Sequence, residues 1–86
     1  MERITNKHLD YQIKILNAHF KIDEWDYKTP NHFYVQGAYG GYRLERVCAN
    51  GSGASDISYR GTKREIFEQL RVLNEGLRLY KELHLS

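Results

Sequence analysis

The stretch His32–Leu70 constrains the fold of this chain more than any other part of the sequence. It contains three short strand-like segments, two glycine-rich turns between them, and the start of a helix directly after the third segment. Glycine tolerates the positive φ angles that tight hairpin turns require, so strands joined by such turns run antiparallel. We therefore expect a meander of antiparallel strands that continues into a helix.

The strands of this meander are predicted from the alternation of apolar and polar residues, which has the period of two of a half-buried strand. They cover residues 32–38, 42–48 and 54–59. Gly40-Gly41 supplies the first turn and Asn50–Gly53 the second. Val47 departs from the alternation of the second strand, which predicts a β-bulge near Arg46.

Two amphipathic helices are predicted on either side of the strands. The first covers residues 6–21, and its apolar stripe is Leu9, Ile13, Leu16 and Phe20. The second begins at a capping box, in which Thr62 and Glu65 each accept a hydrogen bond from the other's backbone N–H. Its apolar stripe is Ile66, Leu70, Leu73, Leu77 and Tyr80. Gly76 is unfavourable inside a helix, so it either permits close packing on the sheet or marks a kink.

The order of elements predicts an α+β fold of the form α-β-β-β-α, a three-stranded antiparallel meander with both helices packed on one face. The chain has the length of a single small domain, residues 1–86. A second apolar stripe lies outside the expected core: Val72, Leu79 and Leu83, with Ile15 and Ile22 from the first helix. It is explained either by a homodimer through the helices or by a thicker monomer core.

The sequence shows no catalytic constellation. Its histidines are scattered and lack the spacing of a metal site: His8, His19, His32 and His84. We expect no enzymatic activity, no catalytic residues, no bound metal and no cofactor. No apolar run approaches the ~20 residues needed to cross a bilayer. The N-terminus lacks an apolar stretch of signal-peptide type, so we expect no membrane association and a cytoplasmic location.

The first hairpin is crowded with aromatic and arginine side chains. A sheet covered on one side can bury only one face, so several of these rings are expected to be exposed. Tyrosine and arginine dominate binding hot spots because they bury a large rigid area. The candidate partner-binding residues are Tyr34, Tyr39, Tyr42, Arg43 and Arg46. The alternative is that these side chains cap the edges of a small core.

A basic cluster surrounds the start of the second helix. The net charge of +2 is too small to indicate nucleic-acid binding by itself. A helix N-terminus favours an anion, however, so Arg60, Lys63 and Arg64 are candidate phosphate-binding residues. The alternative is that these charges serve solubility.

Three motifs in residues 37–77 carry a resemblance to a known group of proteins. They are Tyr39-Gly40-Gly41, Ser55-Asp56-Ile57-Ser58 and Lys63-Arg64-Glu65-Ile66. This pattern, a Y-G-G hairpin and a K-R-E helix start, resembles small uncharacterised proteins encoded by phages and prophages of Firmicutes and gut bacteria. The resemblance covers about half of the chain and implies a mobile-element origin, but it assigns no activity.

The α-β-β-β-α order also resembles the double-stranded RNA-binding domain. That family opens its last helix with basic residues that contact phosphates, and Lys63 and Arg64 match that start. Two features depart from the family. Ile66 and Phe67 stand where it prefers small residues, and the acidic loop Asp23–Asp26 would repel a duplex.

The function we expect is that of a small non-enzymatic phage or mobile-element protein. It would act in the cytoplasm of the host cell by binding a host or phage protein, for example as an anti-CRISPR-like inhibitor of a host defence system. The alternative is a nucleic-acid-binding module that resembles a double-stranded RNA-binding domain.

Overall fold

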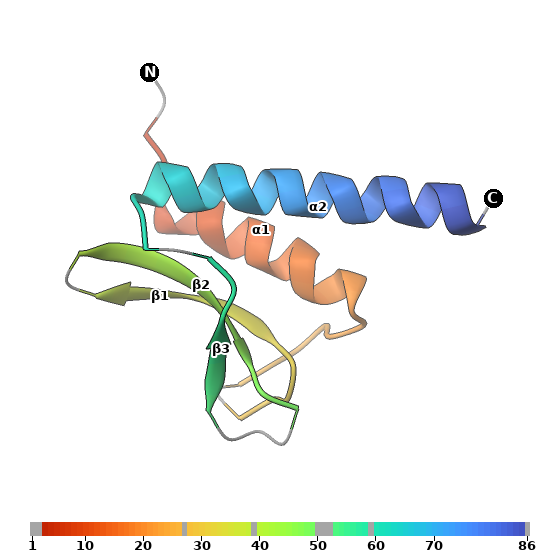
Figure 1. Cartoon of the computed structure of the whole chain (residues 1–86), viewed down its shortest axis with the longest axis horizontal. Helices are drawn as coiled ribbons and strands as arrows, with labels where there is room; N and C mark the ends of the chain where they lie inside the picture. The colour runs from red at the N-terminus through yellow and green to blue at the C-terminus, as the bar shows by residue number, and fades with distance from the viewer. Residues whose placement is uncertain (1–2, 27, 39, 50–52, 59, 86) are drawn as a thin grey trace.

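The computed structural model describes residues 3–26, 28–38, 40–49, 53–58 and 60–85. Its elements, in chain order, are α1 (Asn6–His19), β1 (Phe33–Ala38), β2 (Gly41–Val47), β3 (Ala54–Asp56) and α2 (Lys63–Leu85). The strands form one antiparallel sheet in the order β1-β2-β3. Both helices lie on the same face of this sheet (Figure 1). The structure therefore has the predicted α-β-β-β-α arrangement of the α+β class.

The ends of the elements differ from the prediction by a few residues. α1 ends two residues early, at His19, and Lys21 adopts a left-handed φ of 62°. β3 ends at Asp56, because the chain then turns toward an isolated bridge between Tyr42 and Gly61. α2 continues unbroken through Gly76, where an added Cβ would meet no described atom within 4 Å. Gly76 therefore neither kinks the helix nor packs on the sheet.

The predicted β-bulge is present beside Arg46, but its extra residue lies on the opposite strand. Asn31 and His32 both pair with Val47: the Asn31 N–H donates to the Val47 oxygen at 3.1 Å, the Val47 N–H donates to the His32 oxygen at 3.0 Å, and Asn31 has a φ of 68°. β2 itself carries no extra residue in either of its strand pairs. Arg46 lies on the helix-covered side of β2. Its guanidinium carbon is 5.0 Å from the centre of the Phe20 ring and 4.9 Å from that of Phe33. The Arg46 cation, held against two aromatic rings, thus occupies a strand position that an apolar residue would normally take. Val47, the next residue, is buried on the opposite face of the sheet.

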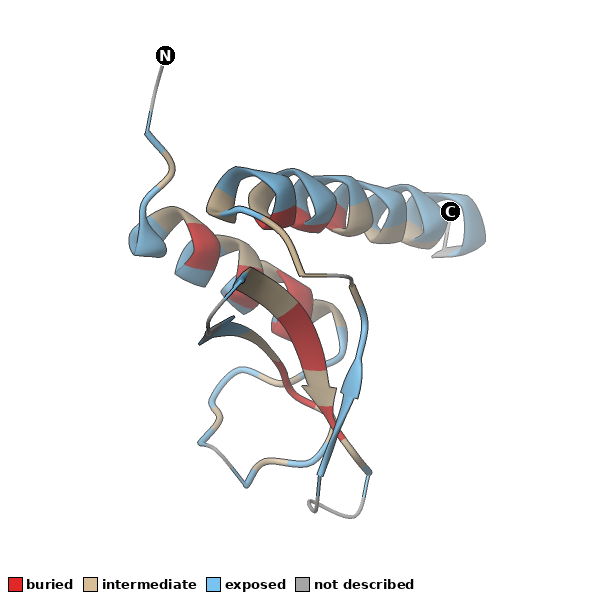
Figure 2. Cartoon of the chain, turned by 60° about the vertical axis from the view of Figure 1, so that its left-hand side comes forward, coloured by how far each residue is buried: buried red, intermediate tan, exposed pale blue. Residues whose placement is uncertain are grey.

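The hydrophobic core fills the space between the helices and the sheet. Its buried members are Leu9, Ile13, Leu16, Phe33, Leu44, Ile66 and Leu70. In Figure 2 the buried positions of both helices are turned toward the sheet. The C-terminal part of α2 extends past the end of α1 (Figure 1), and there the predicted stripe residue Tyr80 is exposed.

One fully buried polar side chain joins α1 to the edge of the sheet. The Asn17 Nδ2 donates to the carbonyl oxygen of Phe33 at 3.1 Å, and the Phe33 N–H donates to Asn17 Oδ1 at 2.7 Å. The side-chain amide therefore pairs with β1 as a neighbouring strand would, but at one residue. Because buried peptide groups are costly to leave unpaired, α1 and β1 depend on this contact.

We expect Asn17→Leu to lower the free energy of unfolding by about 2–4 kcal/mol, because it leaves both peptide groups of Phe33 without partners. Urea unfolding followed by circular dichroism measures the change. Lys14→Ala, an exposed change on the same helix, serves as the control and should stay within about 0.5 kcal/mol of the parent. An Asn17→Leu protein as stable as the control would contradict the role of the amide.

Two glycine-to-alanine changes should act in opposite directions. Gly41 has a φ of +118°, and its Cβ would lie 2.5 Å from the carbonyl oxygen of Gly61, so Gly41→Ala should lose at least about 2 kcal/mol. Gly76→Ala relieves a helix-interior glycine in open space and should gain about 0.5–1 kcal/mol. Thermal melts of both variants test this. Equal melting temperatures would refute it.

Candidate interaction surface

The sheet face that is turned away from the helices carries a network of polar side chains. Strand alternation places these residues opposite Phe33 and Leu44, whose side chains enter the core. The network consists of Tyr34 and Gln36 from β1, Arg43 and Glu45 from β2, and Asp56 from β3. Because both helices cover the other face (Figure 1), this open face is where a partner can approach the sheet.

Glu45 is the centre of the network, and its side chain is only 7% exposed. Its Oε1 accepts a hydrogen bond from the Tyr34 hydroxyl at 2.8 Å. Its Oε2 accepts from Arg43 Nη2 at 3.0 Å and from Arg43 Nε at 3.1 Å. Arg43 also donates to Gln36 Oε1 at 3.2 Å and forms an ion pair with Asp56, Nε to Oδ1, at 3.3 Å. A nearly buried carboxylate is thus fully paired, as a buried charge must be.

The environment of Tyr34 changes its acidity. Burial raises the pKa of the Tyr34 phenol, and both the hydrogen bond to Glu45 and the negative charge of that carboxylate raise the pKa further. The phenol therefore stays protonated at neutral pH and donates to Glu45. Glu45 was not among the predicted site residues. The strand alternation could have indicated it, since the period of two places Glu45 on the same face as Arg43. Tyr34, the antiparallel partner of Glu45, lies on that face as well.

The five candidate partner-binding residues do not form one surface. Tyr34 and Arg43 lie together on the open face. Tyr42 and Arg46 alternate to the helix-covered face of β2, where both are half-buried. Tyr39 lies outside the described residues.

Tyr42 and Arg46 have structural contacts of their own. Tyr42 packs against the core, and the Lys63 Nζ lies 5.5 Å from the centre of its ring. The Arg46 Nε donates to the carbonyl oxygen of Asn31 at 3.0 Å. Both side chains therefore serve the packing of the hairpin, which is the alternative that the sequence left open.

The candidate phosphate-binding residues lie near the start of α2, but two of them contact the hairpin. Arg60 Nη1 donates to the carbonyl oxygen of Gly41 at 3.2 Å, and Lys63 lies over the ring of Tyr42. Arg64 is exposed in the first turn of α2. Arg60 also lines a hollow of about 380 Å³, together with Arg43, Asp56, Ile57 and Ser58.

The predicted capping box at the start of α2 is confirmed. The Thr62 N–H donates to Glu65 Oε1 at 3.0 Å, and the Glu65 N–H donates to Thr62 Oγ1 at 3.1 Å. The hydrogen bond from the Thr62 backbone lowers the pKa of the Glu65 carboxyl. A carboxylate of the chain itself therefore already occupies the helix end at which a phosphate would bind.

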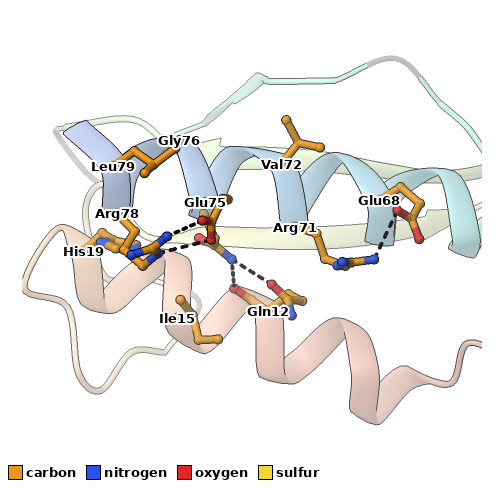
Figure 3. Close-up of a pocket in the computed structure, with 11 residues that line it drawn as sticks. Gln12, Ile15, His19, Glu68, Arg71, Val72, Glu75, Gly76, Arg78 and Leu79 are labelled. Atoms are coloured by element: carbon orange, nitrogen blue, oxygen red, sulfur yellow. Dashed lines mark hydrogen bonds and ion pairs between the residues drawn. The ribbon is translucent and has the colours of Figure 1, made fainter. Parts of the chain in front are cut away.

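A second hollow, of about 780 Å³, lies between α1 and α2 (Figure 3). Its lining includes the apolar side chains Ile15, Val72 and Leu79. Arg78 pairs with Glu75 and, at 2.6 Å, with Glu82, while Arg71 pairs with Glu68 at 3.4 Å.

Asn74 joins the two helices at this hollow. Its Nδ2 donates to both the backbone oxygen and the side-chain Oε1 of Gln12, at 3.0 Å each. Its buried Oδ1 has no hydrogen-bond partner in the part of the chain that the structure describes. The predicted second stripe borders the same region: Val72, Leu79 and Leu83 are 72%, 46% and 79% exposed. A thicker monomer core therefore does not bury these three residues.

No protein-family profile, no curated protein and no solved structure matches this chain. Within the described ranges, no group of three His, Cys, Asp or Glu side chains lies close enough to hold a metal ion. In the same ranges, neither helix combines the length and apolar character needed to span a bilayer.

The raised pKa of Tyr34 predicts how stability depends on pH in the alkaline range. The folded pKa lies above the ordinary value of about 10, so the stabilisation is complete below pH 10 and is lost as the pH rises through the folded pKa. We expect stability to fall more steeply above pH 10 in the parent protein than in Tyr34→Phe. Urea unfolding at a series of alkaline pH values, with Tyr11→Phe as an exposed control, measures this. Parallel curves for Tyr34→Phe and the parent would be inconsistent with it.

Proposed function

We propose that this chain is a small non-enzymatic protein of a phage or mobile element that binds a host or phage protein in the host cytoplasm. The role that fits such a protein is inhibition of a host defence system, in the manner of anti-CRISPR proteins. The motifs at residues 39–41, 55–58 and 63–66 support the mobile-element origin. The observation that carries the binding role is the open sheet face, on which Glu45 holds Tyr34 and Arg43 in place.

Fixed orientation favours binding because a side chain that is already ordered loses little entropy when a partner covers it. The Tyr34 ring is held through its hydroxyl, and the Arg43 guanidinium has three separate partners. The adjoining hollow adds the exposed Ile57 and the charged Arg60. This mixture of an aromatic ring, an apolar residue and both signs of charge is typical of protein-binding surfaces.

The alternative, a module like the double-stranded RNA-binding domain, has one observation in its favour. Arg43 and Arg60 share the hollow beside β3, so two cations from separate elements lie together. Asp56 lines the same hollow and pairs with Arg43, which reduces its attraction for phosphate. The carboxylate of Glu65 at the start of α2 acts in the same direction. The charges therefore favour a protein partner over a duplex.

A charge introduced on the open face should abolish partner binding. Gln36 is exposed in the network, and Gln69 is exposed on α2, so Gln36→Lys and the matched control Gln69→Lys make the same chemical change on the open sheet face and on a helix. We expect a host or phage protein that binds saturably to the parent and to Gln69→Lys. Its affinity for Gln36→Lys should fall by roughly tenfold or more. Quantitative affinity capture from lysates of infected Firmicutes cells identifies the protein, and titration with the purified partner measures its affinity.

Salt-titrated binding to duplex RNA and DNA tests the alternative. An affinity that falls steeply with salt and disappears in the Lys63→Ala/Arg64→Ala double variant would replace the protein-binding proposal with a nucleic-acid-binding one. Absence of measurable duplex binding near physiological salt would remove the alternative.

A further inference from the structure

The outer edge of β1 presents peptide groups that no described residue pairs with. β1 is the terminal strand of the sheet. At Phe33 both peptide groups point outward, because they bond to the side chain of Asn17. Outward groups recur at every second residue of an antiparallel strand. The N–H and C=O groups of Val35 and Gly37 therefore point to the same outer edge.

The partner strand gives the same phase independently. Leu44 lies opposite Val35, and Tyr42 lies opposite Gly37. The backbone of Tyr42 exchanges two hydrogen bonds with Gly61, at 2.7 and 2.8 Å, on the far side of β2. The carbonyl oxygen of Leu44 likewise accepts from residue 57 on that side. These groups therefore turn away from β1, as they must if Val35 and Gly37 are not part of the β1–β2 hydrogen bonds.

A groove of about 600 Å³ lies along this edge, between β1 and α1. Its walls include Leu9 and Asp10 of α1, Trp25 of the following loop, and Tyr34, Val35 and Gly37 of β1. Trp25 is fixed there, since it packs against the core and stacks on His32 with 6.4 Å between ring centres. A groove of this volume is within the usual range for a ligand site.

The edge also lacks the features that normally prevent strand addition. Natural edge strands are protected by charged residues, proline, bulges or a covering element. β1, with the sequence FYVQGA, has neither charge nor proline, and its pairing with β2 shows no bulge from Phe33 to Ala38. The bulge at Asn31 and His32 lies before these residues. Asn17 closes the first outward position, Phe33, and leaves Val35 and Gly37 open. An extended chain is the structure whose peptide groups complement such an edge.

The charge of the groove indicates which kind of extended segment it binds most favourably. Among the described residues that line the groove, Asp10 is the one with a charged side chain, and its charge is negative. Asp23, Glu24 and Asp26 flank Trp25 in sequence and are exposed. A segment that carries lysine or arginine therefore complements this groove better than an acidic one.

We propose that the edge of β1 binds a basic, extended segment of a partner protein as a fourth strand, which pairs with Val35 and Gly37 and lies against Trp25. The inference rests on the proposed protein-binding function, and it specifies the conformation and charge of the segment that is bound. The open face and this edge adjoin at Tyr34, so a partner can contact both.

The test uses the full chain and two synthetic peptides, KVTVKV and its acidic counterpart EVTVEV. Saturation with KVTVKV should slow the exchange of the Val35 and Gly37 amide hydrogens by about tenfold or more, with little change at Phe33, whose N–H is already bonded. EVTVEV should bind roughly tenfold more weakly. Absence of protection at Val35 and Gly37, or equal affinity for the two peptides, would overturn the proposal.

Two variants separate the edge from general effects on folding. Gly37→Ala and Gly37→Pro both place a Cβ about 3.1 Å from the Tyr42 ring, but only proline removes the outward N–H. Gly37→Pro should weaken KVTVKV binding roughly five- to tenfold relative to Gly37→Ala, the loss of one hydrogen bond. Equal affinities of the two variants would refute the strand pairing.

The natural partner distinguishes failure of this inference from failure of the proposed function. Strand addition would be refuted by a partner that loses affinity for Gln36→Lys but binds Gly37→Pro and Gly37→Ala with equal affinity. That result would leave the open-face proposal standing. A dimer in sedimentation experiments that Gly37→Pro dissociates would show that a second copy of the chain takes the edge, which also overturns the proposal.

Discussion

The pairing of the Asn17 amide with the peptide groups of Phe33 determines how the two parts of this fold meet. α1 and the hairpin are separated by a loop, and hydrophobic packing alone would allow the helix to slide along the sheet. A buried amide with two hydrogen bonds fixes one register, because any shift leaves those groups unpaired. That register fixes where α1 lies beside β1. The groove, the open edge and the side of the sheet left to solvent all follow from it.

Sequence patterns predicted the fold class because its elements are local. The Gly40-Gly41 turn, the capping box of Thr62 and Glu65, and the two amphipathic helices each depend on residues a few positions apart, and the structure contains them. Residues 50–52 of the second predicted turn lie outside the described residues. The bulge beside Arg46 has its extra residue on the opposite strand, and the break in the alternation of β2 has a different physical cause. A guanidinium stacked on Phe20 and Phe33 occupies an apolar position, and alternation of residue types cannot distinguish such a cation from a solvent-exposed one.

The candidate site was predicted less completely, because its decisive contacts are remote in sequence. Tyr34 and Arg43 are predicted from their residue types and their place in the hairpin, and the structure brings them together. Tyr42 was selected for residue type alone and lies on the covered face. Glu45 was missed, since its burial depends on Tyr34 eleven positions earlier. The roles of Asn17 and Asn74 could not be predicted, because Phe33 and Gln12, the residues they bind, lie 16 and 62 positions away.

The bridge between Tyr42 and Gly61 has a consequence for the order in which the chain folds. It joins the hairpin to the start of α2 across a short segment, so residues 33–70 can assemble with small losses of loop entropy. Asn17 and Phe33 are 16 positions apart, so α1 can also join the hairpin at a small cost in loop entropy, whereas its contact with α2 from Gln12 to Asn74 spans 62 positions. We therefore expect the contact between α1 and α2 to form last in folding and to open first in native-state hydrogen exchange. Because α1 forms one wall of the groove, a strand bound there would slow this opening.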